Sequence, residues 1–435
     1  MKVFYDISVL GVGQCNPLAR TGVARVVENI AYGLTASKEC DLFFCESLSF
    51  QILKACIHYR DSNPQFKGIP FAHSSFTKIF YNKVLELSAM LNTHNKISDL
   101  TTDDLDKKYL IQSLIHSLEN IDKIIQNYPY SIDPKRLAEV DIFHANFYPI
   151  SERARQAKKT HKFLTVFDLI PILYPQFFGN HGDQKFPSID SLEPDDWVIC
   201  ISNSTKNDLC NYLPIINPDR VFVTHLGAAK NIFYPCFDAA TITSVRNKHS
   251  IPDSPYLLTL STLEPRKNIA HVIRCFARTV QEQNITELFL VLVGNKGWNY
   301  GDILNEISNQ ELLKNRIILT GSVADEDLAA LYSGALAFIY PSFYEGFGLP
   351  PLEAMQCGTP VITSNTSSLP EVVGDAGIML DPTDTDSLCH SILEIYNKSS
   401  LRSDMSLKSL EQAKKFSWEN CTQETIAAYR TALSC

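Results

Sequence analysis

Two glutamates, Glu345 and Glu353, stand at the two ends of the stretch EGFGLPPLE, with seven residues between them. The glycines of this stretch allow the backbone to adopt positive φ angles and to approach a ligand closely. Its two prolines suit the first turn of a helix, where a missing N–H group costs little. We therefore predict a loop that leads into a helix, whose free N–H groups and positive dipole end would bind an anion such as a phosphate.

The two carboxylates would then have different roles. Glu353 is predicted in the first turn of the helix, where it would accept hydrogen bonds from the hydroxyls of a sugar or a ribose. Glu345 is predicted at the end of the preceding strand, pointing at the group that the phosphate carries. The alternative is that Glu353 only complements the helix dipole and that Glu345 is a surface turn residue. The motif alone leaves both interpretations open.

A second motif, STLEPRKNI at residues 261–269, also follows a predicted strand. Its adjacent cations, Arg266 and Lys267, could clamp a diphosphate, the arginine through a planar fork and the lysine as a point charge. Asn268 is predicted to cap the N-terminus of the next helix. An ordinary solvated basic turn is the alternative. A cationic turn and an anion-binding helix start, both at strand ends of one sheet, favour the phosphate interpretation.

The elements that must position these motifs follow a regular pattern from about residue 256 onward. Short apolar runs alternate with amphipathic helical stretches, which is typical of a parallel sheet covered by helices on both faces. This half is therefore predicted to be a doubly wound α/β domain. The predicted strands are YLLTLS, LFLVLVG, RIILTG, LAFIYPS and PVITS, and the predicted helices are NIAHVIRCFARTVQEQ, DEDLAALYSGA and PLEAMQCG.

The first half repeats this pattern less regularly. An amphipathic helix is predicted at residues 22–36, and a polar, strand-free stretch at about 84–135 is predicted to be a helical insertion. Residues 225–235 are predicted to be a linker. The predicted strands are KVFYDISVL, DLFFCES, VDIFHAN, KFLTVFDLI, WVICIS and RVFVTHLG.

These elements predict two domains, at residues 1–228 and 229–415, followed by a last helix at 416–435. In doubly wound domains, ligands bind outside the carboxyl ends of the strands. Both motifs are therefore expected to line a cleft between the two domains.

The composition excludes some classes of protein. The chain has 435 residues and a net charge of −9, which argues against a general nucleic-acid binder. No apolar run approaches the roughly 20 residues that span a membrane, and no secretory signal is expected at the N-terminus. The 12 cysteines show no regular spacing and are expected to be reduced thiols. We therefore expect a cytoplasmic enzyme.

The two motifs also carry a family resemblance. EPRKN, followed further on by PSFYEGFGLPPLEAMQCGTPVI, resembles the retaining glycosyltransferases of family 4, whose GT-B fold has two Rossmann-like domains facing a central cleft. The resemblance is strong over about 256–395, where SSLPEVVGDAG also fits, and weaker elsewhere. TGVARVV, FDLIPILYP and VICISNSTKNDL resemble members that build bacterial surface polysaccharides.

The resemblance implies roles for the residues of both motifs. Glu353 would hold the ribose, Glu345 would lie near the donor sugar, and Arg266 and Lys267 would contact the diphosphate. It further implies that the last helix crosses back onto the N-terminal domain. The other expected donor contacts are Gly346, Phe347, Gly348 and Leu349 of the loop, Gly22 near the start of the chain, and Asn295 and Val323 beside the base.

This sequence departs from the family at two positions. Many relatives have a His-Asp pair where this chain has Phe167 and Asp168, so a role copied from that histidine is in doubt. Asp168 remains a candidate to contact acceptor or sugar. Many relatives also carry an arginine where Thr262 stands, and Arg266 is expected to supply that charge.

A metal site is not expected. The DPTDTD stretch at 381–386 contains a DxD pattern, but it lies between a predicted strand, GIML, and a predicted helix, SLCHSILEIY, which favours an N-cap. His144, at the end of a predicted strand, is interpreted chiefly as a structural residue. No cofactor is predicted, and the charge on the leaving diphosphate would be stabilised by Arg266, Lys267 and the helix start in place of a metal ion.

The sequence therefore predicts a metal-independent, retaining hexosyltransferase. Its donor would be a nucleoside diphosphate sugar, with GDP-mannose suggested by the resemblance. Its acceptor would be a glycan, a lipid-linked acceptor or another hydroxyl acceptor. Peripheral association with the inner face of the plasma membrane is a further expectation. The alternatives are a non-catalytic sugar-nucleotide-binding subunit of a glycan assembly complex and a nucleotide-sugar epimerase on the same fold.

Overall fold

The computed structural model describes residues 1–16, 22–73, 132–181 and 186–435. The predicted helical insertion lies almost wholly outside these residues. The described chain packs as two compact units. The first comprises Met1–Thr165, Pro187–Val198 and Tyr429–Cys435, and the second comprises Val166–Phe186 and Ile199–Ala428.

The first of two six-stranded sheets has the strand order β2-β1-β3-β4-β5-β6. The pairs of β1 with β2 and β3, and of β3 with β4, are parallel. The predicted strands all form, and their bounds are β1 (Lys2–Asp6), β2 (Asp41–Cys45), β3 (Ile142–Asn146), β4 (His161–Val166), β5 (Trp197–Cys200) and β6 (Val221–Val223).

Three strands end four residues earlier than the sequence predicts. One is β6, which ends at Val223. At or just after the ends of the other two, an aspartate bonds to the backbone two residues on. β1 ends at Asp6, whose carboxylate accepts from the Ser8 amide at 2.7 Å, and the residues predicted to continue the strand form a helix. β4 ends at Val166, and Asp168 accepts from the amide of Ile170 at 3.0 Å. A short polar side chain that captures a nearby N–H group competes with the sheet ladder.

The helices of this half of the chain include the predicted helix at 22–36, which forms with those bounds. They are α1 (Ser8–Cys15), α2 (Gly22–Ala36), α3 (Phe50–Ser62), α6 (Pro134–Ala138), α7 (Glu152–Gln156), α8 (Ile170–Leu173), α9 (Pro187–Asp190) and α10 (Asn203–Tyr212), with short 3₁₀ turns at Pro175–His181 and Pro218–Arg220.

His144 lies in the interior of the first unit. Its Nδ1 is 2.5 Å from the Tyr429 hydroxyl and its Nε2 is 2.7 Å from Thr165 Oγ1. Burial lowers the pKa of this imidazole to about 3, so it is neutral at ordinary pH. These contacts support the structural interpretation of His144.

The second sheet has the strand order β12-β11-β10-β7-β8-β9, and each of its strand pairs is parallel. Its strands are almost wholly buried at the centre, which explains their continuous apolar sequences. Their bounds are β7 (Tyr256–Leu260), β8 (Phe289–Val293), β9 (Ile317–Gly321), β10 (Ala337–Tyr340), β11 (Val361–Ser364) and β12 (Ile378–Leu380).

The chain order of this sheet reverses between β7 and β10. From β7 the chain builds outward through β8 and β9, and then returns to add β10 on the other side. Such a switch point opens a crevice at the carboxyl ends of the two strands, where ligands of doubly wound folds bind. Both sequence motifs follow these two strands.

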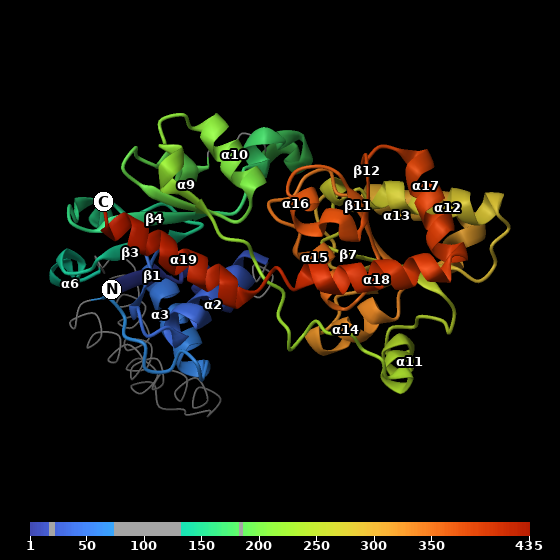
Figure 1. Ribbon diagram of the computed structural model, residues 1–435, viewed down its shortest axis with the longest axis horizontal. Coiled ribbons are helices and arrows are strands. Elements are labelled where there is room, and N and C mark those ends of the chain that lie inside the picture. The colour runs from blue at the N-terminus through green and yellow to red at the C-terminus, as the bar shows by residue number, and fades with distance from the viewer. Residues whose placement is uncertain (17–21, 74–131, 182–185) are drawn as a thin grey trace, which may run out of the picture. The chain divides into compact units, whose positions relative to one another are not determined.

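The second sheet is covered by helices, of which α12 packs against both α13 and α17 (Figure 1). Residues 225–235 contain no helix or strand. The helices of this half are α11 (Ala239–Lys248), α12 (Ile269–Glu282), α13 (Gly301–Asn309), α14 (Asp325–Ser333), α15 (Leu349–Gln356), α16 (Leu369–Val373), α17 (Thr385–Asn397), α18 (Ser399–Ala413) and α19 (Trp418–Leu433), with 3₁₀ turns at Pro265–Lys267, Glu311–Arg316 and Gly374–Ala376.

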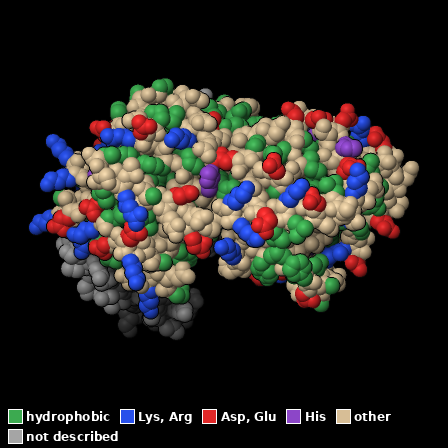
Figure 2. All heavy atoms as spheres, in the orientation of Figure 1, with side chains coloured by type: hydrophobic (Ala, Val, Ile, Leu, Met, Phe, Trp, Pro, Cys, Tyr) green, Lys and Arg blue, Asp and Glu red, His purple; other side chains and the backbone are tan. Residues whose placement is uncertain are grey.

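Acidic and basic side chains are interspersed over the face drawn in Figure 2. No helix of the described residues is both long enough and apolar enough to cross a membrane.

Candidate active site

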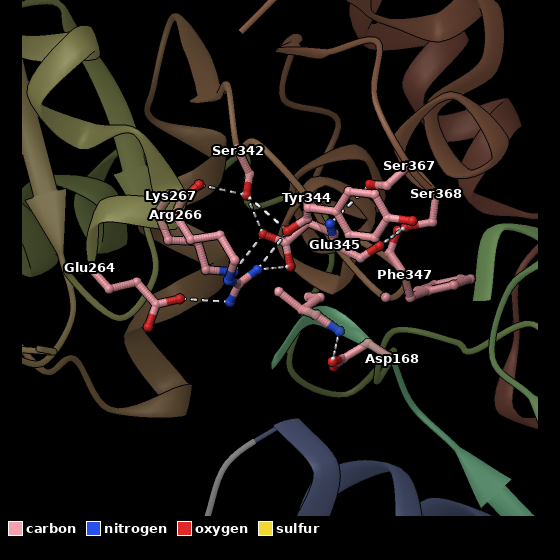
Figure 3. A network of polar contacts seen from close by, with 12 residues as sticks. Asp168, Glu264, Arg266, Lys267, Ser342, Tyr344, Glu345, Phe347, Ser367 and Ser368 are labelled. Carbon is pink, nitrogen blue, oxygen red and sulfur yellow. Dashed lines mark hydrogen bonds and ion pairs between the residues drawn. The ribbon is translucent and has the colours of Figure 1, made fainter. Parts of the chain in front are cut away.

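The loops that follow β7 and β10 meet in a network of polar contacts (Figure 3). After β7 the chain forms a 3₁₀ turn at Pro265–Lys267, which presents Arg266 and Lys267. After β10 it forms the loop that carries Glu345 and leads into α15. The parallel strands bring the two sequence motifs to the same edge of the sheet, as the sequence predicts.

The carboxylate of Glu345 is the centre of this network. Its Oε1 lies 2.6 Å from Lys267 Nζ, 2.6 Å from Ser342 Oγ and 2.9 Å from the Tyr340 hydroxyl, and its Oε2 lies 3.0 Å from Arg266 Nη1. Burial by itself would raise the pKa of Glu345, but the charges of Arg266 and Lys267 outweigh it and hold this pKa at about 2. The alternative of a surface turn residue is therefore wrong, because Glu345 is a buried anion.

Arg266 is bound on several sides by the chain itself. Its Nη1 donates to the carbonyl of Tyr344 at 2.7 Å, and its Nη2 donates to Glu264 at 2.6 Å. Burial acts to lower the pKa of Arg266, yet the charges of Glu345 and Glu264 raise it overall. The guanidinium therefore stays charged between two carboxylates.

The side chain of Lys267 makes fewer polar contacts than that of Arg266. Its Nζ donates to the Tyr340 hydroxyl and to Glu345, each at 2.6 Å. Burial, and then the neighbouring Arg266 charge, lower the pKa of Lys267, while Glu345 opposes the change. The solvated basic turn that the sequence left open is therefore excluded, because Lys267 is only 9 % exposed.

Asn268 occupies the predicted position before α12 but does not cap the helix. It adopts a left-handed conformation with φ of 59°, and its side chain makes no capping hydrogen bond. Its Nδ2 instead donates to the carbonyls of Pro341 at 3.2 Å and Pro382 at 2.7 Å. The prediction of a side-chain cap is wrong, and Asn268 ties the basic turn to two neighbouring loops.

The N-terminus of α15 offers fewer donors than the sequence predicts. Of the four N–H groups that a helix leaves free at this end, Pro350 and Pro351 lack theirs, so only those of Gly348 and Leu349 remain. Gly348 has φ of 119°, which fits a glycine. An anion at this helix start would contact two backbone amides and the positive end of the helix dipole.

Glu353 lies one residue beyond the first turn of α15, so its predicted place in that turn is wrong. It is buried, and its Oε2 accepts from the Tyr332 hydroxyl at 3.3 Å. A carboxylate buried beyond the first turn does little to complement the helix dipole, whose effect falls off within that turn.

Gly346 brings the loop close to another part of the chain. Its φ is not positive, and a Cβ at this position would lie 2.3 Å from the carbonyl oxygen of Phe167. Thr205 Oγ1 lies 3.3 Å from that oxygen and 3.2 Å from the carbonyl of Gly346. The glycine was predicted to let the backbone approach a ligand closely. In the structure, the backbone at Gly346 instead lies close to the segment that contains Phe167 and Asp168.

Asp168 is brought beside the charged network by this contact (Figure 3). Burial raises the pKa of its carboxyl group, and the charges of Arg266 and Lys267 lower it in part. Phe347 points elsewhere, since its ring contacts those of His225 and Phe416.

The two residues predicted beside the base lie on the loops after β8 and β9. Asn295 is exposed and accepts a hydrogen bond from Ser322, whose neighbour Val323 is half-buried. These loops are therefore joined to one another. Gly22 is the first residue of α2 and belongs to the other unit.

Four side chains that hold Glu345 and one that holds Arg266 were not predicted from the sequence. Ser367 Oγ accepts from the Glu345 amide at 2.9 Å, and Ser368 Oγ donates to the Glu345 carbonyl at 3.0 Å. Both serines follow β11, in the SSLPEVV run, so their place at the end of a neighbouring strand was a usable signal. The others are Tyr340, Ser342 and Glu264.

The DPTDTD stretch forms the predicted helix cap. Asp384 is the N-cap of α17 and accepts from the amide of Ser387 at 2.9 Å. Within the described ranges, no group of three or more histidine, cysteine, aspartate or glutamate side chains could hold a metal ion.

Residues 241–412 match the family described as glycosyl transferases group 1. The O-antigen chain mannosyltransferase B of Escherichia coli is 36% identical over 293 residues, which cover 66% of this chain and 74% of that protein. The serotype-specific mannosyltransferase WbdA of Escherichia coli is 30% identical over 269 residues, which cover 61% of this chain and 33% of WbdA. This chain thus spans about a third of WbdA.

The fold is shared with solved structures over the whole chain. The Anabaena protein HepE, solved in complex with UDP and glucose, superposes with a TM-score of 0.64 at 14% identity, covering 99% of this chain and 100% of that one. The two parallel sheets and this likeness confirm the predicted GT-B fold class of two Rossmann-like sheets.

Proposed function

Because this chain belongs to the glycosyl transferases group 1, we propose that it transfers a hexosyl unit from a nucleoside diphosphate sugar to a hydroxyl acceptor in polysaccharide synthesis. The observation that carries the proposal is the buried contact of Lys267 with Glu345 at the switch point of the second sheet. An ammonium group there would stabilise a leaving diphosphate, and a fixed carboxylate would face the sugar from which it departs.

The donor proposed is GDP-mannose. Two similar proteins of Escherichia coli are named as mannosyltransferases, which favours a mannosyl unit. Glu353, buried in α15, would accept hydrogen bonds from the ribose, and Asn295 and Val323 would flank the base. The acceptor would be a hydroxyl of a glycan or lipid-linked glycan.

The reaction would proceed with retention of configuration. Glu345 is not placed to act as a nucleophile, because the donors of four neighbouring side chains occupy both of its carboxylate oxygens. The acceptor hydroxyl would therefore attack from the face that the diphosphate leaves, and its proton would pass to the departing phosphate oxygen. Negative charge that grows on the diphosphate would be met by Lys267 and by the amides that open α15.

The test has two steps. Thermal unfolding is first measured with UDP, GDP, dTDP and their sugars, because a ligand at 100 times its Kd adds about 2.7 kcal/mol to stability. The stabilising nucleotide sugar is then incubated with a mannose-terminated oligosaccharide, and the product is analysed by mass spectrometry and NMR. An α-linked product from an α-linked donor is expected. Binding without transfer or hydrolysis would instead support a non-catalytic sugar-nucleotide-binding subunit.

A further inference from the structure

Arg266 and Lys267 are neighbours in sequence, but they use their hydrogen-bond donors differently. The guanidinium of Arg266 contacts the Tyr344 carbonyl and the carboxylates of Glu264 and Glu345 through Nη1 and Nη2, while its Nε is buried and has no partner among the described residues. The ammonium of Lys267 contacts Tyr340 and Glu345 and has three hydrogens to donate. One N–H group of Lys267 therefore has no acceptor among the described residues.

Arg266 also joins the two loops through its backbone. Its carbonyl accepts from the amide of Phe343 at 3.0 Å, while its Nη1 donates to the carbonyl of Tyr344. One residue of the turn after β7 is thus bound at both ends to consecutive residues of the loop after β10. This pair of bonds fixes the separation of the two loops at the switch point.

Each cation of the network is already paired with a carboxylate. Two cations, Arg266 and Lys267, face two carboxylates, Glu264 and Glu345. To turn Nη1 and Nη2 toward a phosphate, Arg266 would have to leave both carboxylates, and its remaining donor, Nε, is buried. Glu264 is only 2 % exposed, so this movement would strand a buried charge, which is strongly unfavourable.

We propose that Arg266 is a positioning residue, which fastens the turn after β7 to the Glu345 loop, and that Lys267 alone of these two cations contacts the donor's diphosphate. This inference rests on the proposed function. The sequence predicts that both residues contact the diphosphate, whereas this inference gives that contact to Lys267 and a structural role to Arg266. Glu264 then serves to hold the guanidinium of Arg266 against the loop, although it touches no substrate.

The test compares Arg266→Lys with Lys267→Gln in the full chain. Nucleoside diphosphate affinity is measured by calorimetry with UDP and with GDP, alongside kcat, KM and thermal unfolding. Lys267→Gln should weaken nucleotide binding about tenfold and lower kcat by ~10² to 10³ with the fold intact. Arg266→Lys should change the nucleotide Kd and the donor KM less than threefold. It should nevertheless lower kcat at least tenfold and lower the melting temperature, because the side chain no longer binds the turn after β7 to the loop after β10.

The control is Arg274→Lys, on α12. Arg274 pairs with Glu306 at 2.9 Å, and its side chain is 51% exposed, so all four quantities should remain at wild-type values. If Arg266→Lys does not fold, the double variant Glu264→Gln/Arg266→Gln is measured in its place, because it removes one charge of each sign. That pair should also retain nucleotide affinity.

The outcomes separate this inference from the proposed function. If Arg266→Lys, or the paired variant, weakens nucleotide binding as much as Lys267→Gln does, Arg266 is a phosphate ligand and the inference is overturned. The same holds if Lys267→Gln leaves nucleotide affinity unchanged. If the wild-type protein binds neither UDP nor GDP, the proposed function fails first.

Discussion

The ammonium nitrogen of Lys267 lies 2.6 Å from the carboxylate of Glu345, although the two residues are 78 positions apart in the chain. The Tyr340 hydroxyl bridges them, accepting from Lys267 at 2.6 Å and donating to Glu345 at 2.9 Å. All three groups are buried. A buried ion pair fixed by a shared hydroxyl has a defined geometry, which is what a site that stabilises developing charge requires.

The buried carboxylate of Glu345 should make stability depend on acid pH. Its pKa is lowered from 4.5 to about 2 on folding, so its contribution is fully present above pH 5 and is lost as the pH falls through 4.5 toward 2. The shift corresponds to about 3 kcal/mol. The free energy of unfolding of Glu345→Gln at pH 7 should therefore be about 3 to 5 kcal/mol lower than that of wild type, because buried Lys267 loses its carboxylate partner and Arg266 loses one of its two.

The difference in the free energy of unfolding between wild type and Glu345→Gln should become smaller by about 3 kcal/mol as the pH falls from 5 to 2. Denaturant unfolding across this range measures it. Burial raises the pKa values of Glu264 and Asp168, so these two groups change the stability with pH in the opposite direction. Both groups are present in wild type and in the variant, and the difference between the two proteins removes their contribution. A gap that stays constant with pH would show that Glu345 is not a charged partner of Lys267.

Glu353→Gln should weaken the binding of the nucleoside diphosphate. The change keeps the shape of the side chain but removes a charged acceptor for the ribose hydroxyls, which is worth about 1.5 to 3 kcal/mol. Calorimetry with the free nucleoside diphosphate provides the measurement. Tyr332→Phe is the matched control, because it removes only the hydroxyl that donates to Glu353 and should leave affinity within about threefold of wild type. An unchanged Kd in Glu353→Gln would remove Glu353 from the ribose contact.

Gly346→Ala should lower both stability and turnover. The added Cβ would stand 2.3 Å from a backbone oxygen of Phe167, which no rotamer can relieve, so the loop carrying Glu345 must shift. Such overpacking costs about 1 to 3 kcal/mol. Thermal unfolding and kcat are measured together. Gly301→Ala serves as the control, since nothing lies within 4 Å of its added Cβ, and it should be neutral or stabilising. Wild-type behaviour of Gly346→Ala would contradict the close packing of the loop on residue 167.

Activity should not require a divalent cation. In the proposed function, Lys267 and the start of α15 would neutralise the diphosphate in place of a metal ion, and Asp384 of the DPTDTD stretch is engaged as a helix cap. Initial rates are compared before and after EDTA, and after adding Mn²⁺ or Mg²⁺. Loss of turnover in EDTA that Mn²⁺ restores would refute this expectation.

Much of the fold was predictable because it depends on local patterns. Apolar strands alternating with amphipathic helices specify parallel sheets, and every strand of both sheets was predicted near its observed place. Three predicted strands run four residues too far, and in two of them a side chain, Asp6 or Asp168, bonds to the backbone where the sheet ladder was expected to continue. Apolar periodicity does not detect such a bond.

The sequence by itself determined which residues reach the edge of the second sheet. Motifs that follow parallel strands must meet at the carboxyl ends, so Lys267 and Glu345 were expected to lie together. Only the tertiary structure decided what each group does there. It made Glu345 an anion between two cations, directed Gly346 against Phe167 and engaged Arg266 with Glu264 and Tyr344. These contacts join residues that are distant in the chain, and their energies depend on burial and on the sum of nearby charges, which no local pattern encodes.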